Sequence, residues 1–176
     1  DINTVFNRDA AIRLNLVDGT DQLFFDSPFM DPYTNGNTGV MIDENPPVLN
    51  DALGSSAYDV GHVFGTNAGG LANLASACSS SKGRGVSCQF GNAVGDDFFI
   101  IPAHEIGHMF NATHTFNLCD GDNETPSTGY EPGSGSTIMG YSGASNCNTQ
   151  WPQLLGDPYF HHNSMLRIQD FSRDPA

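Results

Sequence analysis

The stretch HEIGHMFNATH, residues 104–114, decides the fold of this chain. His104 and His108 are four residues apart, so a helix would project both imidazoles from one face. Two nitrogens on one face can reach one ion at about 2.0–2.1 Å, the usual zinc–nitrogen distance. Glu105 lies roughly 100° around the helix from His104, where its carboxylate can reach a metal-activated water without binding the metal. Such a carboxylate can act as general base, because zinc lowers the pKa of that water to about 7.

His114 is a third candidate ligand, but only if the chain turns sharply after the helix. Six more helical residues would carry it about 9 Å along the axis beyond His108. Asn111 sits where the turn must fall, and asparagine tolerates the left-handed backbone conformation better than any residue except glycine. We therefore expect a helix from about Asp96 or Asp97 to Phe110, and then a turn that returns His114 to the metal.

A second motif, STIMGY at residues 136–141, places Met139 twenty-five residues after His114. Together the two motifs resemble those of the metzincin zinc peptidases, which carry HExxHxxGxxH and a methionine-containing turn beneath the metal. Within that clan the chain is most similar to bacterial reprolysin-like (adamalysin-like) enzymes. The resemblance implies that Met139 is the Met-turn residue and that Glu105 is the general base. It also implies three zinc ligands: His104, His108 and His114.

The implied function is that of a zinc-dependent endopeptidase that hydrolyses peptide bonds of proteins with a metal-activated water. The implied fold is an α+β zincin, with a twisted mixed sheet, an active-site helix, and a small irregular C-terminal subdomain that ends in a helix. We expect one catalytic domain, with residues 1–114 as the N-terminal subdomain and residues 115–176 as the C-terminal one. Such domains usually begin with a further strand and a long backing helix. The first strand predicted here resembles the one that follows that helix. We therefore expect the chain either to lack this N-terminal part or to be completed by a separate N-terminal fragment, and a propeptide is the other expected partner.

The chain departs from the family pattern at Asn111 and Thr115, and Tyr141 also bears on the choice of subfamily. Asn111 replaces the usual glycine, which the left-handed tolerance of asparagine explains. Thr115 follows the third histidine, where adamalysins have Asp, astacins Glu and serralysins Pro. Tyr141 occupies the position of a tyrosine that can bind zinc and then the oxyanion in astacins and serralysins. Two interpretations of Tyr141 stay open: this role, or packing alone.

Two segments resemble the edge-strand region of reprolysin-like enzymes, residues 58–64 and residues 69–72. A peptide substrate would lie extended and pair its backbone with this edge. The second segment supplies the candidate substrate-binding residues Gly69, Gly70, Leu71 and Ala72. After the Met-turn, Trp151, Leu154 and Leu155 could form a wall of the specificity pocket or a satellite core cluster.

The remaining chain is predicted from apolar patterns and turn residues. Partial alternation favours a strand over residues 4–18 and a short one over residues 23–25. Asp, Asn, Gly and Pro are dense in residues 26–47, which indicates turns and a long loop. A short helix is expected over residues 48–54 and a final one over residues 159–171.

Acidic residues outnumber Lys and Arg by 20 to 6. Such a surface repels phosphate backbones and anionic lipid, so we expect no nucleic-acid or membrane partner. No apolar run approaches the roughly 20 residues that span a bilayer. Some carboxylates could hold calcium, with residues 120–124 (DGDNE) as the best candidate, although they lack the full EF-hand pattern.

Four cysteines occur in the chain, none in a CxxC motif or near histidine at zinc-finger spacing. Disulfides in an oxidising compartment are expected, which favours a secreted protein. Of the three possible pairings we favour Cys78–Cys88 with Cys119–Cys147, because each closes a loop on its own side of the metal motif.

Two rival functions remain. In a gluzincin the third ligand would be a downstream glutamate such as Glu124 or Glu131, but neither lies in an evident helix. In a binding module zinc would be structural, yet a structural site has no use for a base such as Glu105. The other histidines, His62, His161 and His162, are expected to pack or to lie at the surface.

Overall fold

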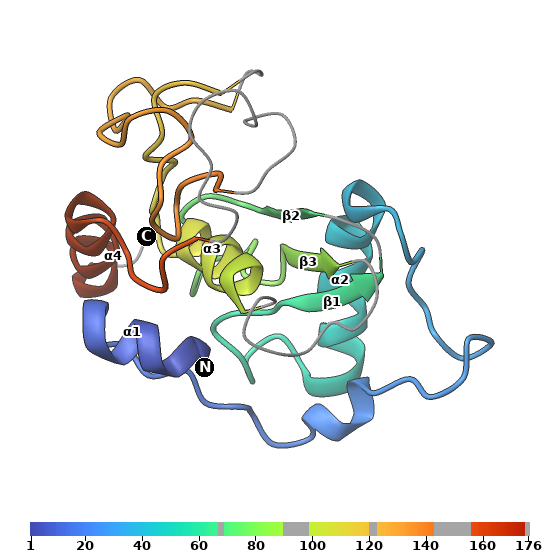
Figure 1. Cartoon of the computed structure of the whole chain (residues 1–176). Helices are drawn as coiled ribbons and strands as arrows, with labels where there is room; N and C mark the ends of the chain where they lie inside the picture. The colour runs from blue at the N-terminus through green and yellow to red at the C-terminus, as the bar shows by residue number, and fades with distance from the viewer. Residues whose placement is uncertain (67–68, 90–98, 120–122, 143–155, 175–176) are drawn as a thin grey trace.

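The computed structural model describes residues 1–66, 69–89, 99–119, 123–142 and 156–174. Its described part has the mixed α+β fold that the sequence predicts, with a three-stranded sheet and α-helices around it (Figure 1). None of its helices has the length and apolar character needed to cross a membrane. In chain order the helical elements are α1 (Ile2–Ala10), the 3-10 helix η1 (Thr20–Leu23), α2 (Thr38–Leu53), α3 (Ile100–Met109) and α4 (His162–Arg173).

The sheet contains β1 (Val63–Thr66), β2 (Gly69–Ala72) and β3 (Gly85–Gln89), in the spatial order β1-β3-β2. β1 runs parallel to β3, and β2 runs antiparallel to β3. β2 therefore lies at one edge of the described sheet, as expected for residues 69–72. The strand predicted over residues 58–64 begins only at Val63, so most of that segment precedes the sheet.

α2 and α3 cover opposite faces of the sheet (Figure 1). Side chains alternate between the faces of a strand. Val86 and Cys88 of β3 pack into a cluster with Met41 of α2. Gly85 faces the other way, and a Cβ placed there would lie 2.8 Å from the sulfur of Met109 in α3. α3, which carries His104 and His108, thus packs on the face of the sheet opposite α2.

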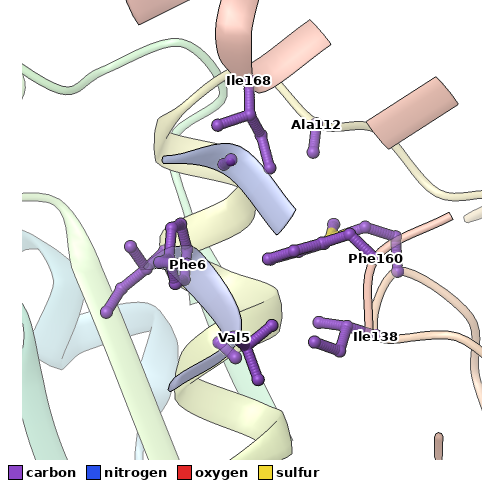
Figure 2. Close-up of a cluster of buried hydrophobic side chains, with 10 residues drawn as sticks. Val5, Phe6, Ala112, Ile138, Phe160 and Ile168 are labelled. Carbon is purple, nitrogen blue, oxygen red and sulfur yellow. The ribbon is translucent and has the colours of Figure 1, made fainter. Parts of the chain in front are cut away.

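The largest apolar cluster joins α3 to α1, α4 and the segment around residue 138 (Figure 2). Val5 and Phe6 of α1 are buried in it, and the Phe6 and Phe160 rings meet edge to face with 5.2 Å between their centroids. Ile168 of α4 and Ile138 complete the part that Figure 2 labels, together with Ala112. The N-terminal and C-terminal helices therefore hold α3 from the side away from the sheet.

The strand predicted over residues 4–18 is wrong, because the chain forms α1 up to Ala10. Val5, Phe6 and Ala10 are buried at helical spacing, and their burial outweighs the alternation farther along. Beyond α1 the chain runs back beside the helix. The Asn3 side chain donates to the Leu14 carbonyl and accepts from the Leu14 amide, each at 2.8 Å. The Asn3 side chain thus makes the two hydrogen bonds that a neighbouring strand would otherwise make with the Leu14 backbone.

The predictions for residues 23–25 and 26–47 also need correction. The first segment contains the end of η1 and no strand. In the second, the loop ends at Asn37, whose side chain accepts from the Val40 amide and caps α2. α2 then continues through Pro46 and Pro47, although each proline inside a helix costs about 3 kcal/mol. Burial of one helix face against the sheet overrides this local penalty.

The predicted Cys78–Cys88 disulfide is wrong, because both thiols are free. Cys88 is fully buried on the α2 side of β3. Cys78 is exposed and follows Ala77, whose amide donates to the carbonyl of Met109 at the end of α3. The Cys88 thiol therefore lies inside the protein, whereas the Cys78 thiol lies at the surface, in a turn near the end of α3. Cys147 lies outside the described residues, so the pairing Cys119–Cys147 stays a prediction.

Native-state thiol labelling should separate the two free cysteines. We expect Cys78 to react with a maleimide in the folded protein, and Cys88 to react only after denaturation, because no solvent reaches its sulfur. Peptide mapping by mass spectrometry would locate the label. A cross-linked peptide containing both residues would contradict the structure.

Candidate metal centre

α3 and the turn after it bring the three predicted histidines together. The helix ends at Met109, and Asn111 takes the left-handed conformation with φ 71°. The Ala112 amide then closes the turn on the Gly107 carbonyl at 2.9 Å. Asn111 is held from α4, because Arg167 donates to its backbone carbonyl and to its side-chain oxygen. The turn expected from the sequence is therefore present, although the proposed helix start at residues 96–97 lies outside the described residues.

The Nε2 atoms of the three imidazoles converge on one point. Nε2 of His114 lies 3.1 Å from Nε2 of His104 and 3.1 Å from Nε2 of His108. Ligands at about 2.0–2.1 Å from a tetrahedral ion are about 3.3 Å apart, so this spacing fits a single small cation. Among the described residues these histidines form the one group of three or more His, Cys, Asp or Glu side chains that could hold a metal.

The hydrogen bonds behind the imidazoles fix their protonation. Nδ1 of His104 donates to the Ile138 carbonyl at 2.7 Å, and Nδ1 of His108 donates to the Ala112 carbonyl at 2.7 Å. A carbonyl only accepts, so each Nδ1 carries the proton and each Nε2 keeps its lone pair.

His114 obeys the same rule, since its Nδ1 lies 2.6 Å from the Asn123 carbonyl. Three lone pairs therefore face one another with no proton between them, so the 3.1 Å contacts are not hydrogen bonds. A metal ion satisfies this arrangement.

Burial favours the neutral imidazoles that metal binding requires. It is the main cause that lowers the pKa of His108 to about 4 and holds the pKa of His104 well below its usual range. The neighbouring imidazoles lower both values further. Burial also lowers the pKa of His114, although less of that side chain is enclosed.

The Met139 turn packs against α3 next to these histidines. Met139 is fully buried, and its carbonyl accepts from the Thr115 amide at 3.2 Å. Gly107 allows the close approach, because a Cβ there would lie 2.8 Å from the Met139 sulfur. The preceding residue, Ile138, supplies the carbonyl that orients His104. The two motifs that are separate in the sequence thus form one unit.

Glu105 lies between α3 and the edge strand β2. Glu105 as a whole is only 6% exposed, and burial raises the pKa of its carboxyl to about 8. A Cβ placed at Gly70 would lie 2.3 Å from Oε1 of Glu105, so a larger residue at this position in β2 would displace the Glu105 side chain. A cation held by the nearby histidines would favour the ionised carboxylate.

Tyr141 also reaches the site. Its ring centroid lies 4.8 Å from that of His114 and 5.9 Å from that of His104. Burial raises the pKa of the Tyr141 hydroxyl, and the charge of Glu105 adds to the effect. Asn123 donates to this hydroxyl at 3.2 Å, while its own backbone carbonyl orients His114.

The chain matches the family model described as reprolysin-like metallopeptidases of family M12B over residues 1–115. It belongs to that family. The match covers α1, the sheet and the three histidines of this reprolysin-like domain, and it confirms the resemblance to reprolysin-like metzincins. Residue 139 lies beyond the match, so the assignment of the Met-turn depends on the packing described above. A comparison with curated proteins gave no match.

The glutamates considered as alternative ligands have other partners. Glu124 accepts from the Cys119 amide at 2.9 Å, and Glu131 is enclosed by hydrogen bonds from three other residues. Neither belongs to the metal group, so the structure gives no support to a gluzincin site. Residues 120–122 of the candidate calcium segment lie outside the described residues, and calcium stays a prediction.

The other histidines lie apart from the metal group. Nε2 of His62 lies 2.8 Å from the Ser87 hydroxyl, and burial lowers the pKa of His62 to about 3. His161 caps α4 and stacks on the Tyr130 ring, and His162 begins that helix. Trp151, Leu154 and Leu155 lie outside the described residues.

Sequence reasoning missed three residues that support the site: Glu131, Asn123 and Arg167. Each acts on a part of the chain at least sixteen residues away, through hydrogen bonds with Thr115, Tyr141 and Asn111 respectively. No local motif marks such a residue, because its partners come together only in the folded chain.

The left-handed turn predicts a difference between two substitutions of Asn111. Both Asn111→Gly and Asn111→Val remove the side-chain bond to Arg167, but only valine is strained at φ 71°. We expect the metal-free Val variant to be less stable than the Gly variant by about 1–2 kcal/mol, measured by denaturant unfolding. Equal stabilities would show that the turn does not require a left-handed residue.

Proposed function

We propose that this chain is a secreted zinc-dependent endopeptidase. The observation that carries the proposal is the convergence of three unprotonated Nε2 atoms beside a buried carboxylate. Three histidines with a fourth position left open are typical of catalytic zinc rather than structural zinc. Family membership supports the same reaction class.

In the proposed reaction His104, His108 and His114 hold the ion, and Glu105 moves the proton. Bound zinc supplies Lewis-acid activation of water and of the peptide carbonyl. Glu105 takes the proton of the attacking water on a carboxylate oxygen and delivers it to the nitrogen of the leaving amine. The Gly70 backbone lies close to the Glu105 side chain and limits where that carboxylate can lie.

We propose that the substrate is an extended peptide that pairs with β2. In the described sheet β2 has β3 on one side only, so its other backbone edge could accept a strand. Gly70 lies next to Glu105, so a peptide along Gly69, Gly70, Leu71 and Ala72 would pass close to the base. Leu71 is 43% exposed and could contact substrate side chains.

We also propose that the enzyme acts outside the cell. The support is the remaining predicted disulfide, Cys119–Cys147, which would persist only in an oxidising compartment. The peptide map used for Cys78 and Cys88 tests this as well. Free thiols at Cys119 and Cys147 in the purified protein would remove the support.

Replacement of the base should separate chemistry from metal binding. We expect Glu105→Ala to keep its zinc, measured by elemental analysis, and to lose about 10²–10⁴-fold in kcat on a fluorogenic peptide library. A chelator should abolish cleavage by the native chain, and added zinc should restore it.

The matched control is Glu44→Ala, which removes an exposed carboxylate on α2 and should cleave at the native rate. Turnover retained by Glu105→Ala would refute its role. A native chain that binds zinc and cleaves no peptide would instead be a binding module with a structural ion.

We further propose that the Tyr141 hydroxyl donates to the oxyanion that forms on the substrate carbonyl. The support is its position, with the ring against His114 and the hydroxyl held by Asn123. Packing alone is the other interpretation.

Removal of the hydroxyl distinguishes these interpretations of Tyr141. Loss of one oxyanion donor typically lowers kcat about 10²–10³-fold, and we expect Tyr141→Phe to show a loss of this order with unchanged zinc content and little change in KM. An unaltered kcat would leave Tyr141 as a packing residue.

A further inference from the structure

Glu131 is a buried carboxylate close to the metal centre and outside its ligand group. Glu131 is only 7% exposed to solvent. One carboxylate oxygen accepts from the amides of Ser136 and Thr137 at 2.9 and 3.0 Å. The other accepts from the Thr137 hydroxyl at 2.6 Å and from the Thr115 hydroxyl. Although burial acts to raise the pKa of Glu131, these bonds hold it below its usual range.

All four donors belong to segments that position the histidines. Thr115 directly follows His114. Thr137 directly precedes Ile138, whose carbonyl accepts from Nδ1 of His104. One carboxylate therefore connects the residue next to one candidate ligand with the segment that orients another.

Backbone contacts strengthen the same connection. The Glu131 amide donates to the Thr115 carbonyl at 2.8 Å, and the Asn117 amide donates to the Glu131 carbonyl at 3.1 Å. Thr115 in turn donates its amide to the Met139 carbonyl. Glu131 thus lies where the chain after the third histidine meets the Met139 turn.

The chemistry of the donors explains why a carboxylate is suited to this position. The two amides can only donate, so they need an acceptor that the rest of the turn does not supply. A glutamine could still accept from both amides through its oxygen, but its NH₂ group would face the two threonine hydroxyls and force them to accept. An alanine would leave both amides without this partner, at a cost of about 1–3 kcal/mol for each buried group.

We propose that Glu131 is a positioning residue that fixes His104 and His114 relative to each other for metal binding. It acts through Thr137 and Thr115 and does not itself touch the metal. The proposal rests on the proposed zinc site. Residues behind metal ligands typically change metal affinity about 10–100-fold when they are replaced.

The test compares Glu131→Ala and Glu131→Gln with the same two substitutions at Glu44. Glu44 is a matched control, because it also accepts from a threonine amide and hydroxyl, those of Thr34, at 2.8 and 2.6 Å. It lies on α2, on the other face of the sheet. Zinc dissociation constants are measured by competition with a chromophoric chelator, and metal-free unfolding is measured on the same samples.

We expect Glu131→Ala to weaken zinc binding about 10–100-fold, with a smaller loss in Glu131→Gln and none in the Glu44 variants. If the Ala variant does not fold, the Gln variant carries the comparison. A Glu131→Gln protein that is less stable but binds zinc with native affinity would overturn the proposal, since Glu131 would then be purely structural.

The zinc titration does not depend on turnover. A native chain that binds zinc but cleaves no peptide would defeat the proposed peptidase function, while the affinity comparison would still decide the role of Glu131. A native chain that binds no zinc would overturn both proposals.

Discussion

Three imidazole lone pairs that face one another at 3.1 Å impose the main constraint on this structure. For all three nitrogens to face one ion, each imidazole must be oriented through its other ring nitrogen. The chain does so with three backbone carbonyls from three separate segments, at Ile138, Ala112 and Asn123. The turn after α3, the Met139 turn and the segment at Asn123 can each be understood as the support for one of these carbonyls.

Close packing around α3 makes these supports effective. Gly107 lets the helix approach Met139, and Gly70 lets it approach the edge strand at Glu105. α1 and α4 fill the remaining side with Phe6 and Ile168. Because α3 is enclosed on each of these sides, His104 and His108 have little freedom to move apart.

The sequence predicted those parts of the site that depend on local geometry. The four-residue spacing of His104 and His108 follows from the helix itself, and the turn follows from the conformational preference of Asn111. Glu131 could not be found in this way, because its donors lie up to sixteen residues away along an irregular chain.

The same distinction between local and long-range interactions explains the errors in the predicted fold. The alternation that suggested a first strand includes Leu16, which is 86% exposed and packs against no sheet. The two prolines that suggested a loop lie within α2, where burial of Met41 against the sheet outweighs their local cost. Cys78 and Cys88 are near in sequence, but Cys88 is buried beside α2 and Cys78 is exposed. In each case tertiary burial, which a pattern along the chain does not report, decided the outcome.

The short edge of β2 has a consequence for how the protein behaves at high concentration. An open strand edge can pair with the same edge of another copy and begin aggregation, and natural proteins limit this hazard by keeping such strands short. β2 has four residues and opens with two glycines. Within the described sheet, two copies paired through this edge would gain few hydrogen bonds and little side-chain contact, so the short strand limits the hazard.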